Sequence, residues 1–378
     1  MKIVIACDSY KGCMSASEVV KTIEKGIKKA NVNHQTICVP MADGGEGTAA
    51  ILAEAIGGEM VDVSCVDAYG NDWKAQYSTN GEISAMDVAS CIGLNMTPRN
   101  QRNPLIASSR GVGMMMKAAL DAGCKKLIIG LGGSATNDGG MGILSSFGIK
   151  FFDAKHREIK PNVYSLNRIA TVDTSNFQFD YDTEIIVMCD VQNTLLGKQG
   201  ATYSFGRQKG IFPNQMEEID GWMAHYVDKI EKAFNTDIHT IPGSGAAGGI
   251  GAVLTGIFHA RMESGIDYLI QLTHLEKHIQ DCDLVITGEG QSDAQTLYGK
   301  VPYGILQLAK RVNKPVLCLS GALSKGYDQL YDAGMIGVFS SADRAMTFQQ
   351  ALAQGPEKLE ALAYSITKYT DGILGGIK

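Results

Sequence analysis

Glycine-rich loops that directly follow short apolar strands constrain this chain most. The sequence holds 44 glycines in 378 residues, and many of them gather behind strand-like runs such as residues 2–7 and 126–130. In parallel α/β sheets, ligands bind beyond the carboxyl ends of the strands, where glycine lets backbone N–H groups approach a phosphate closely. The pattern therefore predicts an α/β fold whose loops bind an anionic ligand.

Strand and helix patterns alternate at both ends of the chain. An apolar strand at residues 2–7 precedes a helix that begins at Ser15, where Ser15 and Glu18 fit a capping box. A second strand at 35–40 leads to a helix that ends near Ile56. The other expected elements are antiparallel strands near 60–66, 73–78 and 82–88, a helix at 110–122, strands at 126–130, 284–287, 316–320 and 336–339, and the last helices at about 347–377.

This order of elements predicts two domains, one of them discontinuous. Residues 1–63 and 283–378 would form a Rossmann-like domain whose parallel sheet is built from both ends of the chain. Residues 64–282 would form a second α/β domain inserted between these two segments. Hydrophobic residues make up 45% and charged residues 20% of the chain, which is ordinary for a globular enzyme.

The charge and cysteine content indicate small-molecule partners and a reducing compartment. A formal net charge of −6 gives no sign of nucleic acid or an anionic membrane as partner. No apolar run approaches the roughly 18 residues of a membrane span, and residues 1–6 resemble a strand rather than a signal peptide. The nine cysteines include no C-x-x-C pair. We therefore expect a cytoplasmic protein.

Acidic residues within the glycine-rich loops favour phosphoryl transfer. The five loops that carry candidate chemistry are residues 8–12, 43–47, 130–140, 243–249 and 288–293, and their acids include Asp43, Glu46, Asp138, Glu289 and Asp293. Any one such loop is more often a tight turn, but five together are not. A carboxylate beside a phosphate is repulsive unless Mg²⁺ lies between them. Lys11 and Lys209 could add fixed positive charge.

A dinucleotide fingerprint offers an alternative function. Gly130-x-Gly132-x-x-Ala135 follows a strand, and Asp153 stands 21 residues after Gly132, as in NAD-dependent dehydrogenases. Against this, the loop continues through residues 136–140 and so delays the helix. Weaker signals are His274 and His278, whose spacing suits a solvated helix face better than a metal site.

Several loops together resemble the type 1 glycerate kinases of bacteria, in the same order and essentially from end to end. The matching segments are Asp8-Ser-Tyr-Lys-Gly12, Met41-Ala-Asp-Gly-Gly-Glu-Gly-Thr48, Gly132-Gly-Ser-Ala-Thr-Asn-Asp-Gly-Gly140, Cys189-Asp-Val191, Gln208-Lys-Gly210, Thr287-Gly-Glu-Gly290 and Asp293-Ala-Gln-Thr296. The resemblance implies ATP-dependent phosphorylation of D-glycerate, generally to 2-phosphoglycerate. It also implies two α/β domains with the active site in the cleft between them.

The chain departs from this family's usual pattern at a few positions. Cys7 and Tyr10 stand where proline and phenylalanine are usual, Asp87 replaces a glutamate, Gln291 replaces an arginine, and Arg207 replaces a proline. None of these changes removes a residue that the resemblance marks as essential.

With this resemblance, the motif residues receive roles as hypotheses. Catalysis is assigned to Asp190 as general base, with Lys11 and Asp293. The ATP phosphates are expected to bind Gly132, Gly133, Ser134, Thr136, Asn137 and Gly139. The substrate is expected to bind Asp8, Ser9, Asp43, Glu46, Arg102 and Lys209, and Mg²⁺ is expected to bind Asp190, Glu289 and Asp293. Glycerate and ATP are the expected partners; the sequence leaves open the product isomer, the oligomeric state and a non-catalytic, metabolite-binding role.

Overall fold

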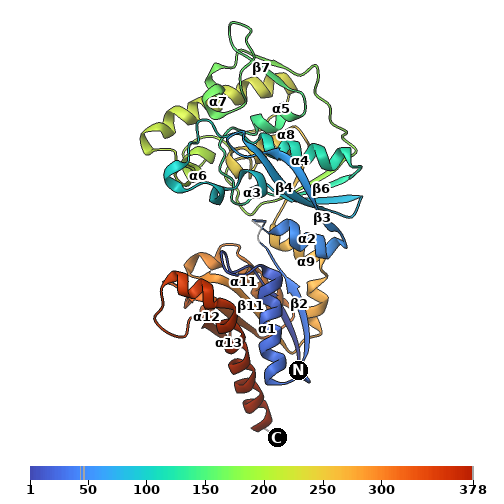
Figure 1. Cartoon of the computed structure of the whole chain (residues 1–378), viewed down its shortest axis with the longest axis vertical. Helices are drawn as coiled ribbons and strands as arrows, with labels where there is room; N and C mark the ends of the chain where they lie inside the picture. The colour runs from blue at the N-terminus through green and yellow to red at the C-terminus, as the bar shows by residue number, and fades with distance from the viewer. Residues whose placement is uncertain (43, 46, 377–378) are drawn as a thin grey trace. The chain divides into compact units, whose positions relative to one another are not determined.

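The computed structural model describes residues 1–42, 44–45 and 47–376 (Figure 1). The chain divides into two compact units, each described here by itself. Unit 1 comprises residues 1–43 and 266–378, and unit 2 comprises residues 44–265. Each unit has its own largely or wholly parallel sheet, so the predicted α/β class is confirmed.

Unit 1 is built on a five-stranded sheet whose strands are all parallel. The order is β13 (Gly337–Ser340), β12 (Val316–Leu323), β11 (Leu284–Ser292), β1 (Lys2–Cys7) and β2 (Gln35–Pro40). Counted along this unit, the order is 2-1-3-4-5, which is the flavodoxin-like variant of the doubly wound fold. The prediction of a sheet built from both chain ends is confirmed. In this order the winding reverses between β1 and β11, where ligands bind in such folds.

Helices α1 (Ala16–Ala30) and α13 (Phe348–Gly376) pack side by side on one face of this sheet (Figure 1). A Cβ at Gly26 of α1 would lie 2.4 Å from the carbonyl oxygen of Glu360, so only glycine permits this close approach. The predicted capping box is confirmed, because Ser15 Oγ accepts from the Glu18 N–H at 3.3 Å. The predicted last helices are one continuous helix, α13.

The remaining helices of unit 1 connect its strands. They are α9 (Gly265–Leu272), which begins at the last residue of unit 2, α10 (Leu275–Gln280), α11 (Val301–Arg311) and α12 (Gln329–Ala333). Helix α11 contacts β11 and β1. His274 lies just before α10 rather than within it, so His274 and His278 do not share one helix face as expected.

Unit 2 is built on a mixed six-stranded sheet. The order is β10 (Arg261–Glu263), β9 (Glu184–Met188), β6 (Lys126–Gly130), β5 (Ile83–Asp87), β4 (Asp72–Thr79) and β3 (Glu59–Val66). Strands β3, β4 and β5 are antiparallel, whereas β5, β6, β9 and β10 are parallel. Its other elements are a hairpin of β7 (Lys150–Phe152) and β8 (Thr171–Asp173), and helices α2 (Thr48–Ile56), α3 (Ala89–Ile92), α4 (Arg110–Asp121), α5 (Met141–Ser146), α6 (Ala201–Lys209), α7 (Met216–Phe234) and α8 (Ile250–Gly256).

The boundaries between the units differ from the expected positions near residues 63 and 283. All eight residues of β3 pair with β4, so the segment 44–63 belongs to unit 2. At the other end, a Cβ at Gly304 of α11 would meet Ile266 of α9 at 2.2 Å, which shows that α9 packs within unit 1. Strand pairing therefore sets the first boundary and helix packing the second, and a linear pattern displays neither.

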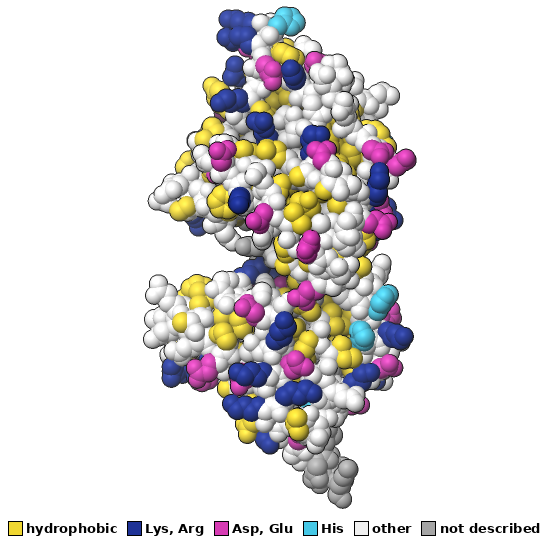
Figure 2. All heavy atoms as spheres, turned by 45° about the vertical axis from the view of Figure 1, so that its right-hand side comes forward, with side chains coloured by type: hydrophobic (Ala, Val, Ile, Leu, Met, Phe, Trp, Pro, Cys, Tyr) yellow, Lys and Arg dark blue, Asp and Glu magenta, His cyan; other side chains and the backbone are white. Residues whose placement is uncertain are grey.

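The face of the molecule shown in Figure 2 carries no large field of one charge among the described residues. On the face shown in Figure 2, Lys and Arg side chains are interspersed with Asp and Glu side chains over both units. All nine cysteines are free thiols. Within the described part of the chain, every helix is too short or too polar to cross a membrane.

Candidate functional site

A pocket of about 730 Å³ lies in unit 1 at the carboxyl ends of β1, β11, β12 and β13. The loop after β1 contributes Asp8, Ser9 and Lys11 to its lining, and β11 contributes Glu289. Lys300, which precedes α11, completes this end of the pocket. The structure therefore brings together four of the predicted site residues at the point where the winding of the sheet reverses.

The loop after β1 is held in place by backbone and tyrosine contacts. The Asp8 N–H donates to the Gly288 carbonyl at 2.9 Å, and the Ser9 N–H donates to Asp8 Oδ1 at 2.6 Å. Tyr10 is 3% exposed, and its hydroxyl donates to the Leu319 carbonyl of β12 at 2.7 Å. Burial raises the pKa of Tyr10. This contact accounts for a tyrosine where the resembling family usually has phenylalanine, and it leaves Lys11 exposed.

Glu289, itself part of the pocket lining, forms an ion pair with Lys300. Its Oε1 accepts from Thr296 Oγ1 at 2.7 Å and from Ser292 Oγ at 2.9 Å, and its Oε2 accepts from Lys300 Nζ at 3.0 Å. Glu289 is 5% exposed, so this charge-assisted bond lies in a poorly solvated place. Asp293 lies 3.9 Å from the same Nζ, and its Oδ1 also caps the following turn by accepting from the Gln295 N–H at 2.8 Å.

The loop at residues 132–140 of unit 2 is packed into the protein interior. Thr136, Asn137 and Asp138 have no exposed surface, and Ser134 is 5% exposed. A Cβ at Gly139 would lie 2.5 Å from the Tyr226 ring. Gly139 is thus required by packing, and the predicted contacts of the loop's residues with ATP phosphates stay a prediction.

Asp138 ties this loop to the start of α4. Its Oδ2 accepts from the Ser109 N–H at 2.7 Å, from Ser109 Oγ at 2.9 Å and from the Gly142 N–H at 3.1 Å. Burial raises the pKa of Asp138, while these hydrogen bonds act in the opposite direction. Among the described residues, the Thr136 hydroxyl has no hydrogen-bond partner, which keeps Thr136 a candidate for contact with a ligand.

Lys209 is buried rather than presented to solvent. It is 2% exposed, and its Nζ donates to the Thr136 carbonyl at 2.6 Å and to Ser134 Oγ at 3.2 Å. Desolvation lowers the pKa of Lys209 to about 7, although the nearby Asp138 carboxylate acts to raise it. Arg102 is likewise engaged, because its Nε donates to the Thr97 carbonyl at 3.1 Å and its Nη1 to the Gln208 carbonyl at 2.8 Å.

Two aspartates lie at the carboxyl ends of β9 and β5, the two strands that flank β6 in the unit 2 sheet. Asp190 follows β9, is exposed, and accepts from the Gly265 N–H at 3.2 Å. Asp87 ends β5, is 6% exposed, and accepts from the N–H groups of Gly47 at 3.0 Å and Ala49 at 3.1 Å. Asp87 therefore caps α2 from outside the helix, since Gly47 has no side chain to do so. The predicted substrate ligands Asp43 and Glu46 lie outside the described residues.

The geometry does not favour the dehydrogenase alternative. Asp153 follows β7, which pairs only with β8 and lies outside the main sheet of unit 2. Its carboxylate binds the Arg157 guanidinium at 2.8 Å, and the hydrogen bonds from Arg157 lower its pKa to about 2. Gly132 is explained by packing instead, because a Cβ there would lie 2.6 Å from the Cα of Gly45.

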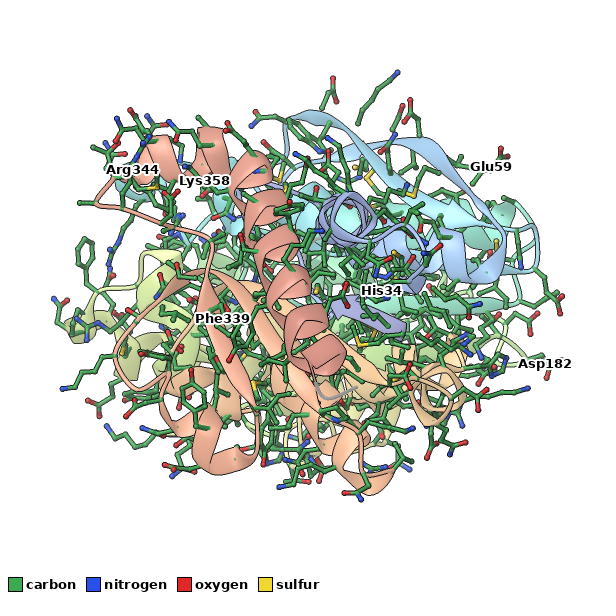
Figure 3. All side chains as sticks on the ribbon, turned by 90° about the horizontal axis from the view of Figure 1, so that it is seen from below. His34, Glu59, Asp182, Phe339, Arg344 and Lys358 are labelled. Atoms are coloured by element: carbon green, nitrogen blue, oxygen red, sulfur yellow. The ribbon has the colours of Figure 1, made fainter. Side chains whose placement is uncertain are left out.

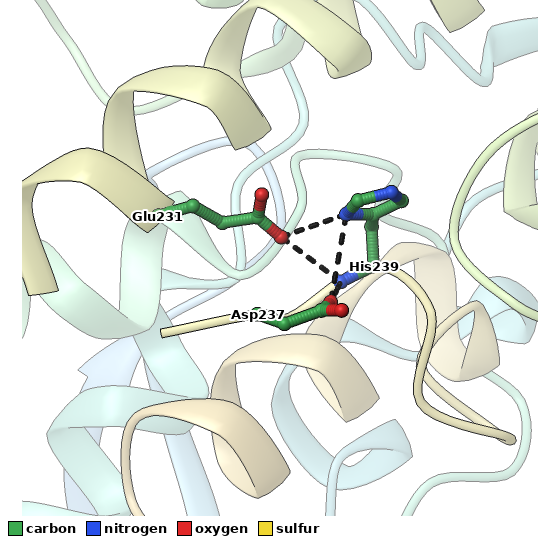
Figure 4. Close-up of side chains that lie close together, drawn as sticks. All are labelled: Glu231, Asp237 and His239. Carbon is green, nitrogen blue, oxygen red and sulfur yellow. Dashed lines mark hydrogen bonds and ion pairs between the residues drawn. The ribbon is translucent and has the colours of Figure 1, made fainter. Parts of the chain in front are cut away.

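The structure groups three possible metal ligands at one place that the sequence did not single out. In the described part of the chain, the one set of three or more His, Cys, Asp or Glu ligand atoms within 4.8 Å of one another is Glu231, Asp237 and His239 (Figure 4). His239 Nδ1 lies 2.7 Å from Glu231 Oε1. Asp237 Oδ1 accepts from the Thr240 N–H at 3.1 Å, so these groups stabilise the turn after α7.

Sequence reasoning missed Lys300 and Arg344, which both line the unit 1 pocket. A signal for Lys300 was present, because it precedes a helix that has Pro302 in its first turn. A lysine at a helix N-terminus opposes the helix dipole and so needs a compensating partner, here Glu289. Arg344 lies in the loop before α13, where the sequence carries no comparable mark.

The fold and the unit 1 pocket are those of an α/β protein with a ligand-sized pocket at the carboxyl edge of a parallel sheet. The family model described as "Glycerate kinase family" matches residues 3–371. The chain belongs to the glycerate kinase family, and it is a phosphotransferase that acts on an alcohol group.

Individual relatives are similar to this chain over nearly its whole length. The chain is 41% identical to "Glycerate 2-kinase" of Escherichia coli (strain K12), with 93% of each protein covered. It is 37% identical to "Glycerate kinase" of Bacillus subtilis (strain 168), with 97% of each covered. A crystal structure assigned to glycerate kinase 2 of Salmonella typhimurium LT2 superimposes with a TM-score of 0.86 at 38% identity, covering 99% of each chain.

Proposed function

We propose that this protein transfers the γ-phosphoryl group of ATP to the 2-hydroxyl of D-glycerate, assisted by Mg²⁺. The observation that carries the proposal is the set of acids and lysines that line the unit 1 pocket of a glycerate kinase family member: Asp8, Lys11, Glu289 and Lys300. The 2-position is supported by the E. coli relative, which is named "Glycerate 2-kinase". Phosphoryl transfer depends mainly on positioning and charge neutralisation, which such groups supply.

Asp190 is the proposed general base. Its carboxylate is exposed at the end of β9, and one of its oxygens accepts from the Gly265 N–H, which fixes its direction. The carboxylate would accept the proton of the glycerate hydroxyl as the oxygen attacks phosphorus. Lys11, with Asp8 and Ser9 beside it, would bind the transferred phosphoryl group.

The donor set in unit 1 fits Mg²⁺. This ion is usually bound by one or two carboxylates together with substrate phosphates, rather than by an all-protein cage. Glu289 and Asp293 both approach Lys300 Nζ, at 3.0 and 3.9 Å, so two carboxylates are held near one another. Glu289 and Asp293 would hold the ion, and Asp190, also a predicted ligand, is assigned the role of base instead. When bound, Mg²⁺ would neutralise negative charge on the phosphate oxygens.

Arg102 and Lys209, both predicted to bind the substrate, are assigned different roles here. Arg102 is only half-buried and already lies against the Gln208 carbonyl, so we assign the glycerate carboxylate to Arg102. Lys209 is buried against Thr136 and Ser134, so we assign it to holding the 132–140 loop. Asp43 and Glu46 remain predicted substrate ligands.

The proposal is tested by coupled ADP release from purified protein with Mg-ATP. D-Glycerate should be required for release, and chelation of Mg²⁺ should abolish it. Release with another small hydroxy acid and none with glycerate would refute the substrate. Absence of release with every acid, together with a nicotinamide-dependent change in absorbance, would refute the kinase and restore the dehydrogenase.

A further inference from the structure

We propose that the unit 1 pocket binds the nucleotide, with its purine base against Phe348 and its phosphates beside Lys11 and Lys300. The inference rests on the proposed function, from which it takes ATP as the second substrate. It replaces the 132–140 loop as the place of the nucleotide and assigns each end of the pocket to one part of the ligand.

The pocket is large enough for a nucleotide and much larger than a three-carbon acid needs. Its volume is about 730 Å³, within the range of roughly 300–1,000 Å³ that is usual for sites of drug-sized ligands. The lining extends over the ends of four neighbouring strands, from β1 to β13. Three spacings between neighbouring parallel strands give about 14 Å, which matches an extended nucleoside triphosphate.

The two ends of the pocket differ in chemistry. At the β1–β11 end lie Lys11 and Lys300, whose ammonium groups can bind phosphate oxygens, together with the acids that would hold Mg²⁺. At the β13–α13 end the lining is mostly apolar and includes Met346, Phe348 and Leu352. A nucleotide suits such a pocket, because its phosphates are charged and its purine base is flat and aromatic.

Phe348 is the most informative residue of the apolar end. It lies in the first turn of α13 and is 76% exposed although it lines the pocket. A large aromatic side chain left exposed in a concave site has a face available for stacking. Stacking of a base on an aromatic ring contributes roughly 1–3 kcal/mol, which corresponds to about five- to 150-fold in affinity.

Basic side chains lie beside this apolar end. Arg344, in the loop before α13, and Lys358, within α13, both line the pocket and are labelled in Figure 3. Lys358 Nζ binds Asp343 Oδ2 at 2.7 Å, which neutralises much of its charge. Arg344 instead donates to the neutral Gln354 amide at 3.0 Å. The Arg344 guanidinium can therefore contact the base or the ribose-proximal phosphate.

The 132–140 loop offers less to a nucleotide. Its side chains are at most 5% exposed from Ser134 to Asp138, and Lys209 donates to Ser134 and the Thr136 carbonyl. The pocket, in contrast, presents Lys11, Lys300 and an exposed aromatic ring.

The test is calorimetric titration of the full-length protein with ADP and Mg²⁺. Phe348→Ala should raise the Kd for ADP about tenfold or more, whereas Phe348→Trp should restore binding because it keeps an aromatic face. The matched control is Tyr369→Ala, which removes an exposed aromatic residue (71% exposed) from the same helix but outside the pocket, and should bind ADP as wild type does. An unchanged Kd for Phe348→Ala would overturn the proposal, as would weakened binding by Thr136→Val alone.

Steady-state kinetics separate this inference from the proposed function. Phe348→Ala should raise the KM for ATP and leave the KM for D-glycerate within about twofold. If wild type releases ADP with glycerate while Phe348→Ala has an unchanged KM for ATP, the function stands and the nucleotide site is wrong. If wild type binds ADP in a Phe348-dependent way but transfers nothing to glycerate, the site stands and the function is wrong.

Discussion

Lys209 shows how burial changes what a lysine can do. The sequence predicted it as a positively charged substrate ligand, because it is basic and lies in the Gln208-Lys-Gly210 motif. The structure surrounds its amino group with Ser134, the Thr136 carbonyl and the apolar interior, and desolvation lowers its pKa to about 7. A lysine that loses its proton near neutral pH acts as a hydrogen-bonding group rather than as a permanent positive charge.

This lowered pKa makes the stability of the fold depend on pH. The amino group has a pKa of about 7 in the folded protein and ~10.4 when unfolded, so between these values the unfolded chain binds more protons. Stability from this group therefore rises with pH, by at most about 1.4 kcal/mol per unit. Urea unfolding of wild type and Lys209→Met should be measured between pH 7 and 9. As pH rises, the free energy of unfolding of wild type should increase relative to that of the variant. A constant difference would contradict the assignment.

The proposed base makes a second prediction at the scale of one residue. Asp190→Asn keeps the shape and the hydrogen bond from Gly265 but cannot accept the substrate proton, so kcat should fall ~100-fold or more with a smaller change in KM. Asp182→Asn, at an exposed position in the turn before β9 (Figure 3), should keep wild-type turnover. Unchanged turnover in Asp190→Asn would remove Asp190 from this role.

At the scale of the element, Asp87 provides a cap that its own helix lacks. Asp87→Ala would leave the Gly47 and Ala49 N–H groups of α2 without their acceptor, and should lower the free energy of unfolding by about 1–2 kcal/mol. Hydrogen exchange should be faster at residues 48–52. Asp72→Ala, at an exposed position of β4, is the matched control and should change stability by less than about 0.5 kcal/mol. Equal effects of the two substitutions would refute the cap.

Local elements were largely predictable from the sequence, and packing was not. The strand at residues 35–40 and the capping box at Ser15 follow from local pattern, and the structure places both where expected. The burial of Gly139 depends on Tyr226, which lies far along the chain and carries no local mark of that contact. Likewise, the pocket and its Lys300 arise because β1 and β11 become neighbours, although the whole of unit 2 separates them in sequence.

At the scale of the whole molecule, the chain contains one unit that is continuous in sequence. Unit 2, at residues 44–265, pairs all its sheet strands internally and has its own hydrophobic core. Unit 1 cannot form from either of its segments alone, because β1 requires β11 as its neighbour.

A fragment of residues 44–265 should therefore fold alone, with a cooperative urea transition. The fragment 64–282, which follows the boundaries expected from sequence, lacks α2 and most of β3 and should be less stable, because β4 loses most of one of its two partner strands. Circular dichroism during urea titration of both fragments tests this. Equal midpoints, or no cooperative transition in residues 44–265, would contradict the division.

The central claim concerns the bond that the protein forms, and phosphorus NMR of the reaction products tests it most directly. Full-length protein, Mg-ATP and D-glycerate should give one new phosphomonoester signal, identical to authentic 2-phosphoglycerate, in an amount equal to the ADP released. A signal matching 3-phosphoglycerate, or ADP and inorganic phosphate with no phosphomonoester, would contradict it.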